Sequence, residues 1–270
     1  MRGVVLSRRL SCQLAATLLL ACFAGCVQVP QGGEQNDIKP ESEQSKAERS
    51  ARVHLELAGL YLGRNQAQTA LDEVKLALAS KPDLPEAYNL RGLAYGALGD
   101  ASAADASFQH ALQLAPNDGA TLHNYGWFLC QERHFAQAHA RFDAALKLPQ
   151  YRDRQRTLLA QGVCDARAGD WPAAEVALMH SYELDPSNPA IAFNLSEVLL
   201  HRGEFERARF YIKRVNDVPE QSNAQSLWLA ARIEHRAGKN SAAQDFGRQL
   251  RERFPKSAEA LKFERGQFDE

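Results

Sequence analysis

The sequence lacks a hydrophobic run long enough to span a membrane. An apolar stretch from Leu10 to Phe23 contains only small or uncharged interruptions, and it follows Arg2, Arg8 and Arg9. At about 1.5 Å per residue, this stretch is too short for a hydrocarbon core of roughly 30 Å. A basic start, a short apolar run and small residues after it are typical of an export signal, so we expect residues 1–25 to be a signal peptide.

Basic clusters are also missing from the rest of the chain. The formal charge is −1 at pH 7, and loss of the three signal-peptide arginines would make it −4. No block of Lys and Arg remains after residue 25. This distribution excludes the electrostatic footprint of a nucleic-acid-binding protein, and we expect no nucleic-acid partner.

Recognisable catalytic motifs are absent as well. The sequence has no glycine-rich phosphate loop, no GxSxG turn and no pair of neighbouring aspartates in apolar surroundings. His134 and His139 are five residues apart, which does not place two metal ligands on one helical face. We therefore expect a protein that is not an enzyme and that uses no cofactor, metal or small-molecule substrate.

Cysteine is scarce, and its positions matter more than its number. Of five cysteines, Cys12 and Cys22 lie in the expected signal peptide, and Cys26 follows it directly. Only Cys130 and Cys164 remain, which is too few for a disulfide framework in a chain of this size.

The stretch "FAGC" that ends at Cys26 resembles a bacterial lipoprotein cleavage box. That resemblance implies a lipid anchor on Cys26, and Val27, which is not an aspartate, implies sorting to the outer membrane. An ordinary secretory signal cut near Gly25 is the alternative, and "LLAC" at Cys22 is a poorer box because Leu20 stands where a small residue is preferred.

Residues 26–50 contain mostly Gly, Pro, Gln, Glu and Ser, with almost no large apolar side chain. Such a segment cannot bury enough surface to offset the entropy of ordering its chain. We expect a lipidated, disordered tether that holds the folded part, residues 51–270, close to the membrane.

Beyond residue 50 the chain repeats itself with a period near 34 residues. Three series run in the same phase, a small residue, a proline and a turn glycine: Ala70, Ala104, Ala138, Ala174, Ala208 and Ala243; Pro82, Pro116, Pro186 and Pro255; Gly99, Gly169, Gly203 and Gly238. Small residues allow two helices to approach closely, glycine makes the turn between them, and proline ends the second helix. The window from Pro85 to Pro116 matches the tetratricopeptide pattern.

This periodicity predicts an all-α tetratricopeptide-repeat superhelix of six helix-turn-helix repeats. The repeats are expected to begin near Ala51, Pro85, Gly119, Gln155, Pro189 and Ala224, with a two-residue insertion around "LPQYRD" before the fourth. The segment from Lys256 to Phe268 is predicted to be a terminal helix that caps the last repeat.

The resemblance to tetratricopeptide arrays implies that the first helices of the repeats line the inner surface of the superhelix. Their inner positions combine apolar side chains with asparagines and form our candidate partner-binding groove: Asn89, Leu93, His123, Asn124, Trp127, Leu159, Val163, Phe193, Asn194 and Glu197. An apolar strip with polar edges is typical of an interaction surface, and asparagine amides can bind the backbone of a peptide. The alternative is that tight winding packs these side chains against the next repeat.

The stretch "LHNYGWFLC" contains both architecture and candidate function. Gly126 is predicted to be the small site of a first helix, with Leu122 and Tyr125 in the core, whereas Trp127 faces inward. His123 lies two helical turns, about 10 Å, from Cys130, which is too far to activate a nucleophile.

Cys130 and Cys164 fall on the first helices of repeats three and four, at repeat positions 12 and 10. Because these positions differ, we expect the side chains to point apart and to remain two buried thiols. A disulfide between the two helices stays the alternative.

Taken together, the "FAGC" box, the tether and six repeats with "HNYGWFLC", "LPQYRDR", "SLWLAARIEHRAG" and "LRERFPKSAE" resemble the type IV pilus biogenesis lipoproteins of the PilW/PilF kind. The resemblance implies a pilotin, an outer-membrane lipoprotein facing the periplasm that binds the secretin subunit and helps it to reach or assemble in that membrane. A different hypothesis for the same repeats is a periplasmic adaptor that recruits peptidoglycan-remodelling enzymes.

Overall fold

The computed structural model describes residues 43–268 of the chain. The expected signal peptide, the lipid site at Cys26 and most of the expected tether lie outside the described residues. No helix within the described range is both long enough and apolar enough to cross a membrane.

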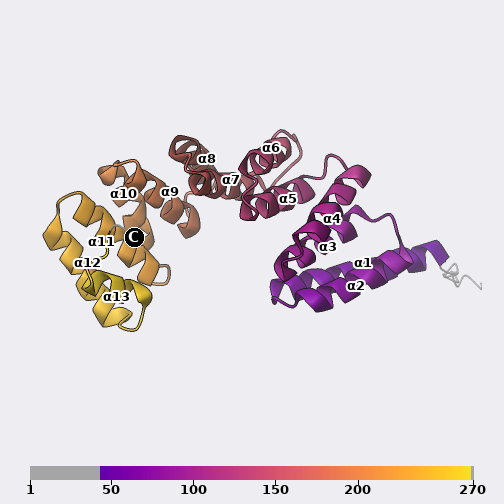
Figure 1. Cartoon of the computed structure of the whole chain (residues 1–270), viewed down its shortest axis with the longest axis horizontal. Helices are drawn as coiled ribbons and strands as arrows, with labels where there is room; N and C mark the ends of the chain where they lie inside the picture. Colours follow the sequence, from indigo (N-terminus) through magenta and orange to yellow (C-terminus); the bar gives the residue numbers. More distant parts are fainter. Residues whose placement is uncertain (1–42, 269–270) are drawn as a thin grey trace, which may run out of the picture. The chain divides into compact units, whose positions relative to one another are not determined.

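The described chain is entirely α-helical, with thirteen helices in residues 43–268 (Figure 1). Their bounds are α1 Glu43–Gly63, α2 Ala67–Ser80, α3 Pro85–Leu98, α4 Ala101–Leu114, α5 Gly119–Gln131, α6 Phe135–Leu146, α7 Arg154–Ala168, α8 Trp171–Leu184, α9 Pro189–His201, α10 Phe205–Asn216, α11 Ala224–Arg236, α12 Asn240–Arg253 and α13 Ala258–Glu264. Consecutive helices pack as six pairs, α1 with α2 through α11 with α12, and α13 follows alone. The predicted all-α array of six repeats with a final helix is confirmed.

The repeat boundaries follow the sequence period closely. Four first helices begin at the predicted residues, and α7 begins one residue early, at Arg154. The exception is α1, which begins at Glu43 instead of Ala51. Lys81 of the following loop pairs with Glu48 at 3.0 Å, so this early turn is held against the first repeat. Residues 43–50, expected as the end of the disordered tether, are therefore helix.

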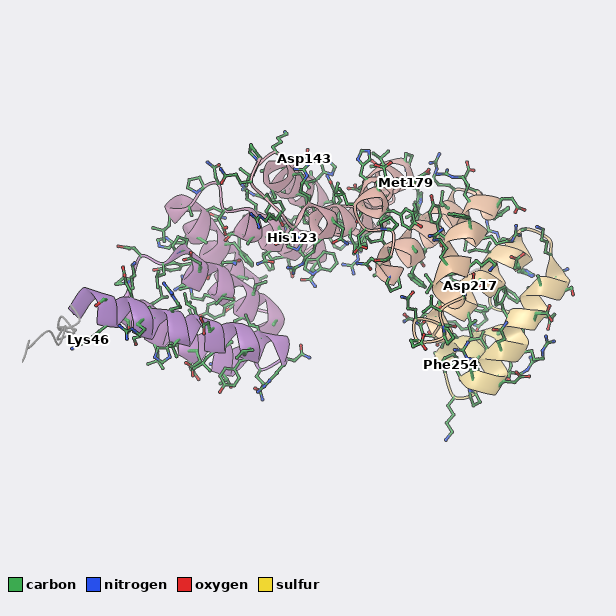
Figure 2. All side chains as sticks on the ribbon, turned by 180° about the vertical axis from the view of Figure 1, so that it is seen from behind. Lys46, His123, Asp143, Met179, Asp217 and Phe254 are labelled. Atoms are coloured by element: carbon green, nitrogen blue, oxygen red, sulfur yellow. A yellow bond between two sulfur atoms is a disulfide. The ribbon has the colours of Figure 1, made fainter. Side chains whose placement is uncertain are left out.

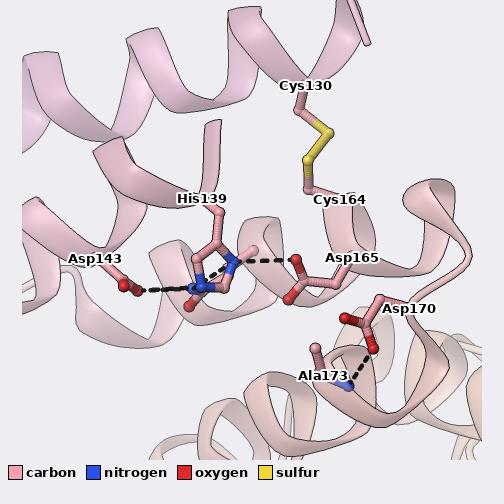
Figure 3. Close-up of polar contacts among 8 residues, drawn as sticks. Cys130, His139, Asp143, Cys164, Asp165, Asp170 and Ala173 are labelled. Atoms are coloured by element: carbon pink, nitrogen blue, oxygen red, sulfur yellow. Dashed lines mark hydrogen bonds and ion pairs between the residues drawn. A yellow bond between two sulfur atoms is a disulfide. The ribbon is translucent and has the colours of Figure 1, made fainter. Parts of the chain in front are cut away.

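The turns inside the repeats require a left-handed backbone. Gly99, Gly169, Gly203 and Gly238 all have φ between 74° and 83°, as their common phase predicts. In the first and third repeats the same turn is made by Asn65 and Arg133, with φ of 58° and 64°. In the second and fourth repeats an aspartate follows the turn and caps the next helix; Asp170 accepts a hydrogen bond from the backbone N–H of Ala173 at 3.1 Å (Figure 3).

The small sites of the first helices are required by packing inside each pair. A methyl group added at Gly126 would lie 2.8 Å from the ring of Phe142 on the second helix, and one at Gly92 would lie 2.8 Å from the ring of Phe108. Both rings are fully buried. The predicted role of Gly126 is confirmed. The ring of Phe142 lies so close to the backbone of Gly126 that a side chain would not fit, which explains why a residue of low helix propensity occupies this position.

The final helix is shorter than predicted, since α13 spans residues 258–264 and not 256–268. Its Phe263 is 6% exposed and lies over Gly247 of α12, leaving no room for a side chain there. Together with Leu250 and Trp228, it closes a small apolar cluster at the end of the array. The terminal helix thus covers the last repeat, as the cap hypothesis requires.

Every first helix after α1 contacts both helices of the repeat before it. Each odd-numbered helix contacts the next odd-numbered helix, whereas within residues 43–268 no even-numbered helix contacts the next even-numbered one. The first helices therefore form a continuous row through the array, with each also packed on the second helix of the preceding repeat, and we call this row the inner side of the array. The predicted groove residues all come from these helices.

Candidate functional site

The first part of the predicted strip lies on α3 and α5. Asn124 donates a hydrogen bond from Nδ2 to Oδ1 of Asn89 at 3.1 Å, joining two repeats. Asn89 is buried and Leu93 is half-buried against the neighbouring core. The amides of Asn89 and Asn124 thus bind each other and hold consecutive repeats together. At these two positions the structure agrees with the alternative that the side chains pack against the next repeat.

Trp127 is half-buried on the inner side of α5. Its ring packs at the edge of the core of repeats two to four, and the guanidinium of Arg167, from α7, lies 5.0 Å above it. A cation over an indole is a favourable contact of about 0.5–1 kcal/mol at an exposed site. Trp127 therefore has a partner inside the chain and still keeps part of its surface accessible.

His123 is a correction to the predicted groove. It is 5% exposed and lies between α5 and α7, among the side chains shown in Figure 2. Its Nδ1 lies 2.9 Å from Oγ1 of Thr157, whose hydroxyl also lies 2.7 Å from the hydroxyl of Tyr151. Burial, assisted by the charge of Arg156, lowers the pKa of His123 to about 4. This residue is a neutral interior group and not part of an accessible surface.

Tyr151 explains why the insertion before the fourth repeat matters. Its ring covers Gly119 at the start of α5, where an added methyl would lie 2.4 Å from a ring carbon. Residues 148–153 of this loop and residues 117–120 at the start of α5 border a cavity of about 470 Å³. The insertion therefore reaches back over the third repeat and fixes the hydroxyl chain that holds His123.

A disulfide joins Cys130 of α5 to Cys164 of α7, with Cα atoms 5.8 Å apart (Figure 3). The expectation of two buried thiols was wrong. The interface between α5 and α7 pairs residues 34 apart, both at His123–Thr157 and at the cysteines, whereas equivalent repeat positions here are 36 apart because of the insertion. A residue on α5 therefore contacts the residue two positions before its equivalent on α7. Cys130 at repeat position 12 and Cys164 at repeat position 10 fit this offset, so their sulfurs lie together.

A polar cluster lies beside the disulfide. His139 of α6 contacts Asp165 through Nδ1 at 3.2 Å (Figure 3). Gln161 donates a hydrogen bond to Asp143 at 3.0 Å. Burial is the main cause that raises the pKa of Asp165. Among the described residues there is no group of three or more His, Cys, Asp or Glu side chains that could hold a metal ion. The cluster joins α6 to α7.

The second part of the predicted strip borders open space. Val163, Asn194 and Glu197 line a cavity of about 340 Å³ between α7, α8 and α9. Phe193 and Glu197 line a second cavity of about 460 Å³ between α9, α11 and α13. Leu159 is half-buried against the core of repeats four to six. Of the predicted residues, those on α9 together with Val163 are brought together around accessible cavities.

Sequence reasoning missed several residues of these cavities. Trp171 stacks on His201 with ring centroids 4.1 Å apart, and both line the smaller cavity. Lys262 of α13 reaches the larger one. His201 follows Glu197 by four residues, so helical spacing alone assigns it to the same face. Trp171 and Lys262 come from a second helix and from the cap, which the search for inner positions of first helices did not include.

Comparisons with known proteins agree with this architecture. Models described as tetratricopeptide repeat match residues 85–118 and 166–233. The type IV pilus assembly protein PilF of Pseudomonas aeruginosa is 26% identical over 247 residues, which cover 92% of this chain and 95% of that protein.

Two solved structures extend the likeness to the fold. The crystal structure of PilW, described as a widely conserved type IV pilus biogenesis factor, is 29% identical and covers 79% of this chain and 97% of its own, with a TM-score of 0.73. The structure of PilF from Pseudomonas aeruginosa is 22% identical and shares the fold with a TM-score of 0.70, covering 82% of this chain and 99% of its own.

Proposed function

We propose that this chain, a tetratricopeptide-repeat protein homologous over most of its length to the PilF and PilW type IV pilus assembly proteins, acts in type IV pilus assembly. The observation that carries the proposal is the alignment with PilF along nearly the whole of both proteins, not along the repeats of one region. A shared repeat consensus alone fits many scaffolds, whereas this alignment covers 92% of this chain and 95% of PilF. The biochemical role is that of a protein-binding scaffold and not of an enzyme.

More specifically, we propose a pilotin role. The chain would be held at the outer membrane by lipid on Cys26, face the periplasm, bind the secretin subunit and promote its localisation or multimerisation. The lipoprotein box at residues 23–26 supports the anchor, and the inner-side cavities of repeats four to six support partner binding. A lipoprotein cysteine carries more than one acyl chain, which is enough for stable anchoring.

The pilotin proposal is tested by secretin multimers in a deletion strain. We expect heat- and detergent-resistant multimers to be lost from the outer membrane, together with surface pili and twitching motility, and to return on complementation. Multimers of normal abundance in the deletion strain would exclude the pilotin role. If cell shape or lysis changed instead, the peptidoglycan-adaptor hypothesis would replace it.

The anchor is tested separately by fractionation of a Cys26→Ser variant. We expect the variant protein to leave the outer-membrane fraction, since its residues 43–268 contain no helix able to cross a membrane. The matched control is Cys12→Ser, within the signal peptide, which should leave the fractionation unchanged. A Cys26→Ser protein that still sediments with outer membrane would contradict lipidation as the anchor.

A further inference from the structure

The two inner-side cavities are adjacent on α9 and share two lining residues. Both are lined by Glu197 and His201, which are four residues apart and lie on the same side of the helix. We name the combined surface the α9 groove. It is formed mainly by Arg167 of α7, by Phe193, Glu197 and His201 of α9, and by Trp228 and Arg232 of α11.

The α9 groove is cationic in a protein whose formal charge is −1. Arg167, Arg232 and Lys262 line it, with Glu197 as the opposing carboxylate. Within residues 43–268, neither Arg167 nor Lys262 forms an ion pair with a carboxylate. Three cations around an apolar floor attract carboxylates more strongly than neutral polar groups.

Arg232 retains binding capacity although its side chain is only 12% exposed. Its ion pair with Glu197 is long, at 3.9 Å, and its Nε donates to the carbonyl of Phe268 at 3.2 Å. A guanidinium has five N–H donors in a planar fork suited to a carboxylate. The remaining donors lie at the wall of the larger cavity.

One end of the α9 groove already holds an irregular chain segment. After α13 the chain turns back, and the ring of Phe268 stacks on His235 at 4.0 Å and on Trp228 at 5.3 Å. Its carbonyl is the group that Arg232 binds. This contact demonstrates how the inner face of α11 takes a segment without regular structure, with an aromatic ring on Trp228 and a backbone oxygen on arginine.

We propose that the α9 groove binds an extended, acidic segment of a partner protein, with an aromatic or aliphatic side chain of that segment on the Phe193–Trp228 floor and its carboxylates on Arg167, Arg232 and Lys262. This inference rests on the proposed function, because it specifies which chemistry in the assembly partner the repeats recognise. It assigns recognition to repeats four to six, where cations and cavities coincide.

The test uses the full chain purified in detergent and fluorescein-labelled synthetic peptides. The probe is Asp-Glu-Phe-Asp-Glu-Leu, and its matched control is Asn-Gln-Phe-Asn-Gln-Leu, which keeps the shape and removes the charge. We expect fluorescence anisotropy to show saturable binding of the acidic peptide, weakened by salt because exposed charges are screened. Affinity for the amide peptide should be at least about tenfold lower. Equal binding of the two peptides would overturn the proposal.

Variants locate the site on the protein. Arg167→Gln and Lys262→Gln should each lower the affinity for the acidic peptide by about fivefold. The double variant Arg167→Gln, Arg232→Gln should show no measurable binding. Arg248→Gln, at an exposed arginine on α12, is the control that should bind as the wild type does. Circular dichroism melting of each variant separates lost binding from lost folding. Wild-type affinity in a folded Arg167→Gln, Lys262→Gln double variant would overturn the proposal.

The chain's own tail is the competing occupant. Phe268→Ala should leave acidic-peptide binding within about twofold of wild type if the groove is open to a partner. Binding that appears only in Phe268→Ala would assign the groove to the tail and overturn the proposal. Because no secretin is present in these measurements, their failure leaves the deletion-strain test of the pilotin role unaffected.

Discussion

His123 illustrates how burial changes a single side chain. The folded-state pKa is about 4, below the usual 6.5, so the folded protein keeps the ring neutral while the unfolded chain protonates it below pH 6.5. Stability contributed by the neutral ring is therefore complete above pH 6.5 and is lost as the pH falls towards 4. The surface role expected for this residue is replaced by a role in the α5–α7 interface.

We expect His123 to cost the wild type up to roughly 3 kcal/mol of unfolding free energy between pH 7 and pH 4. His123→Gln should remove that part of the loss, because its amide reaches Thr157 without titrating. Urea denaturation at both pH values measures the difference. His134→Gln, at an exposed histidine, is the control, and an equal loss in wild type and His123→Gln would contradict the assignment.

Arg133 makes a turn that glycine makes in four other repeats. Its φ of 64° is unfavourable for a residue with a side chain. We expect Arg133→Gly to raise the unfolding free energy by about 0.5–1 kcal/mol, after allowing for the greater freedom of glycine in the unfolded chain. Gln131→Gly, at the exposed end of α5, should instead lower it, by less than the roughly 1 kcal/mol of a helix interior. Thermal melting of both variants checks the opposite signs.

At the scale of elements, the α5–α7 contact is the most strongly tied of the inner contacts between repeats. It combines the Cys130–Cys164 disulfide, the His123–Thr157 hydrogen bond and the reach of Tyr151 over Gly119. The stretch "NYGWFLC" and the insertion "PQY" that distinguish this sequence from a repeat consensus are the parts that build this contact.

Removing the disulfide should destabilise this junction. The bond closes a loop with a sequence separation of 34, for which chain entropy predicts roughly 3–4 kcal/mol. We expect Cys130→Ser with Cys164→Ser to lower the urea-unfolding free energy by that amount, and dithiothreitol to have the same effect on the wild type but none on the variant. An unchanged midpoint in the double variant would show that the junction does not depend on the bond.

The cap helix gives a matched pair of residues. Phe263 is 6% exposed in the terminal cluster, whereas Leu261, two residues earlier, is 46% exposed. Phe263→Ala should lower the free energy of unfolding by about 3 kcal/mol because it leaves a cavity, and Leu261→Ala should lower it by less than about 0.5 kcal/mol. Equal effects in denaturant unfolding would mean that α13 does not cap the array.

At the scale of the whole described array, stability is shared between neighbouring repeats and is not uniform. The core of repeats one and two consists largely of alanines with Leu71 and Val74. The core of repeats four to six is larger and includes Leu195, Leu199 and Ile212. More buried apolar area per helix gives greater local stability at about 25 cal/mol per Å².

Native-state hydrogen exchange should follow this difference. We expect backbone amides of α1 and α2 to exchange faster than those of α9 and α10, because the smaller core opens at lower free energy. Mass spectrometry of peptic fragments after timed exchange measures it. Uniform protection from α1 to α12 would show that the array unfolds as one unit, contrary to the expectation for a repeat array of this kind.

The sequence by itself determined the repeats, because their period comes from packing within one helix pair, where small residues, turn glycines and capping residues act over short distances. Gly126 facing Phe142 and the turn at Gly169 are of this kind. Contacts between repeats were decided only by the tertiary structure. The offset between α5 and α7 buries His123 and joins Cys130 to Cys164. The residues that meet across these helices are 34 apart, although equivalent repeat positions are 36 apart because of the insertion.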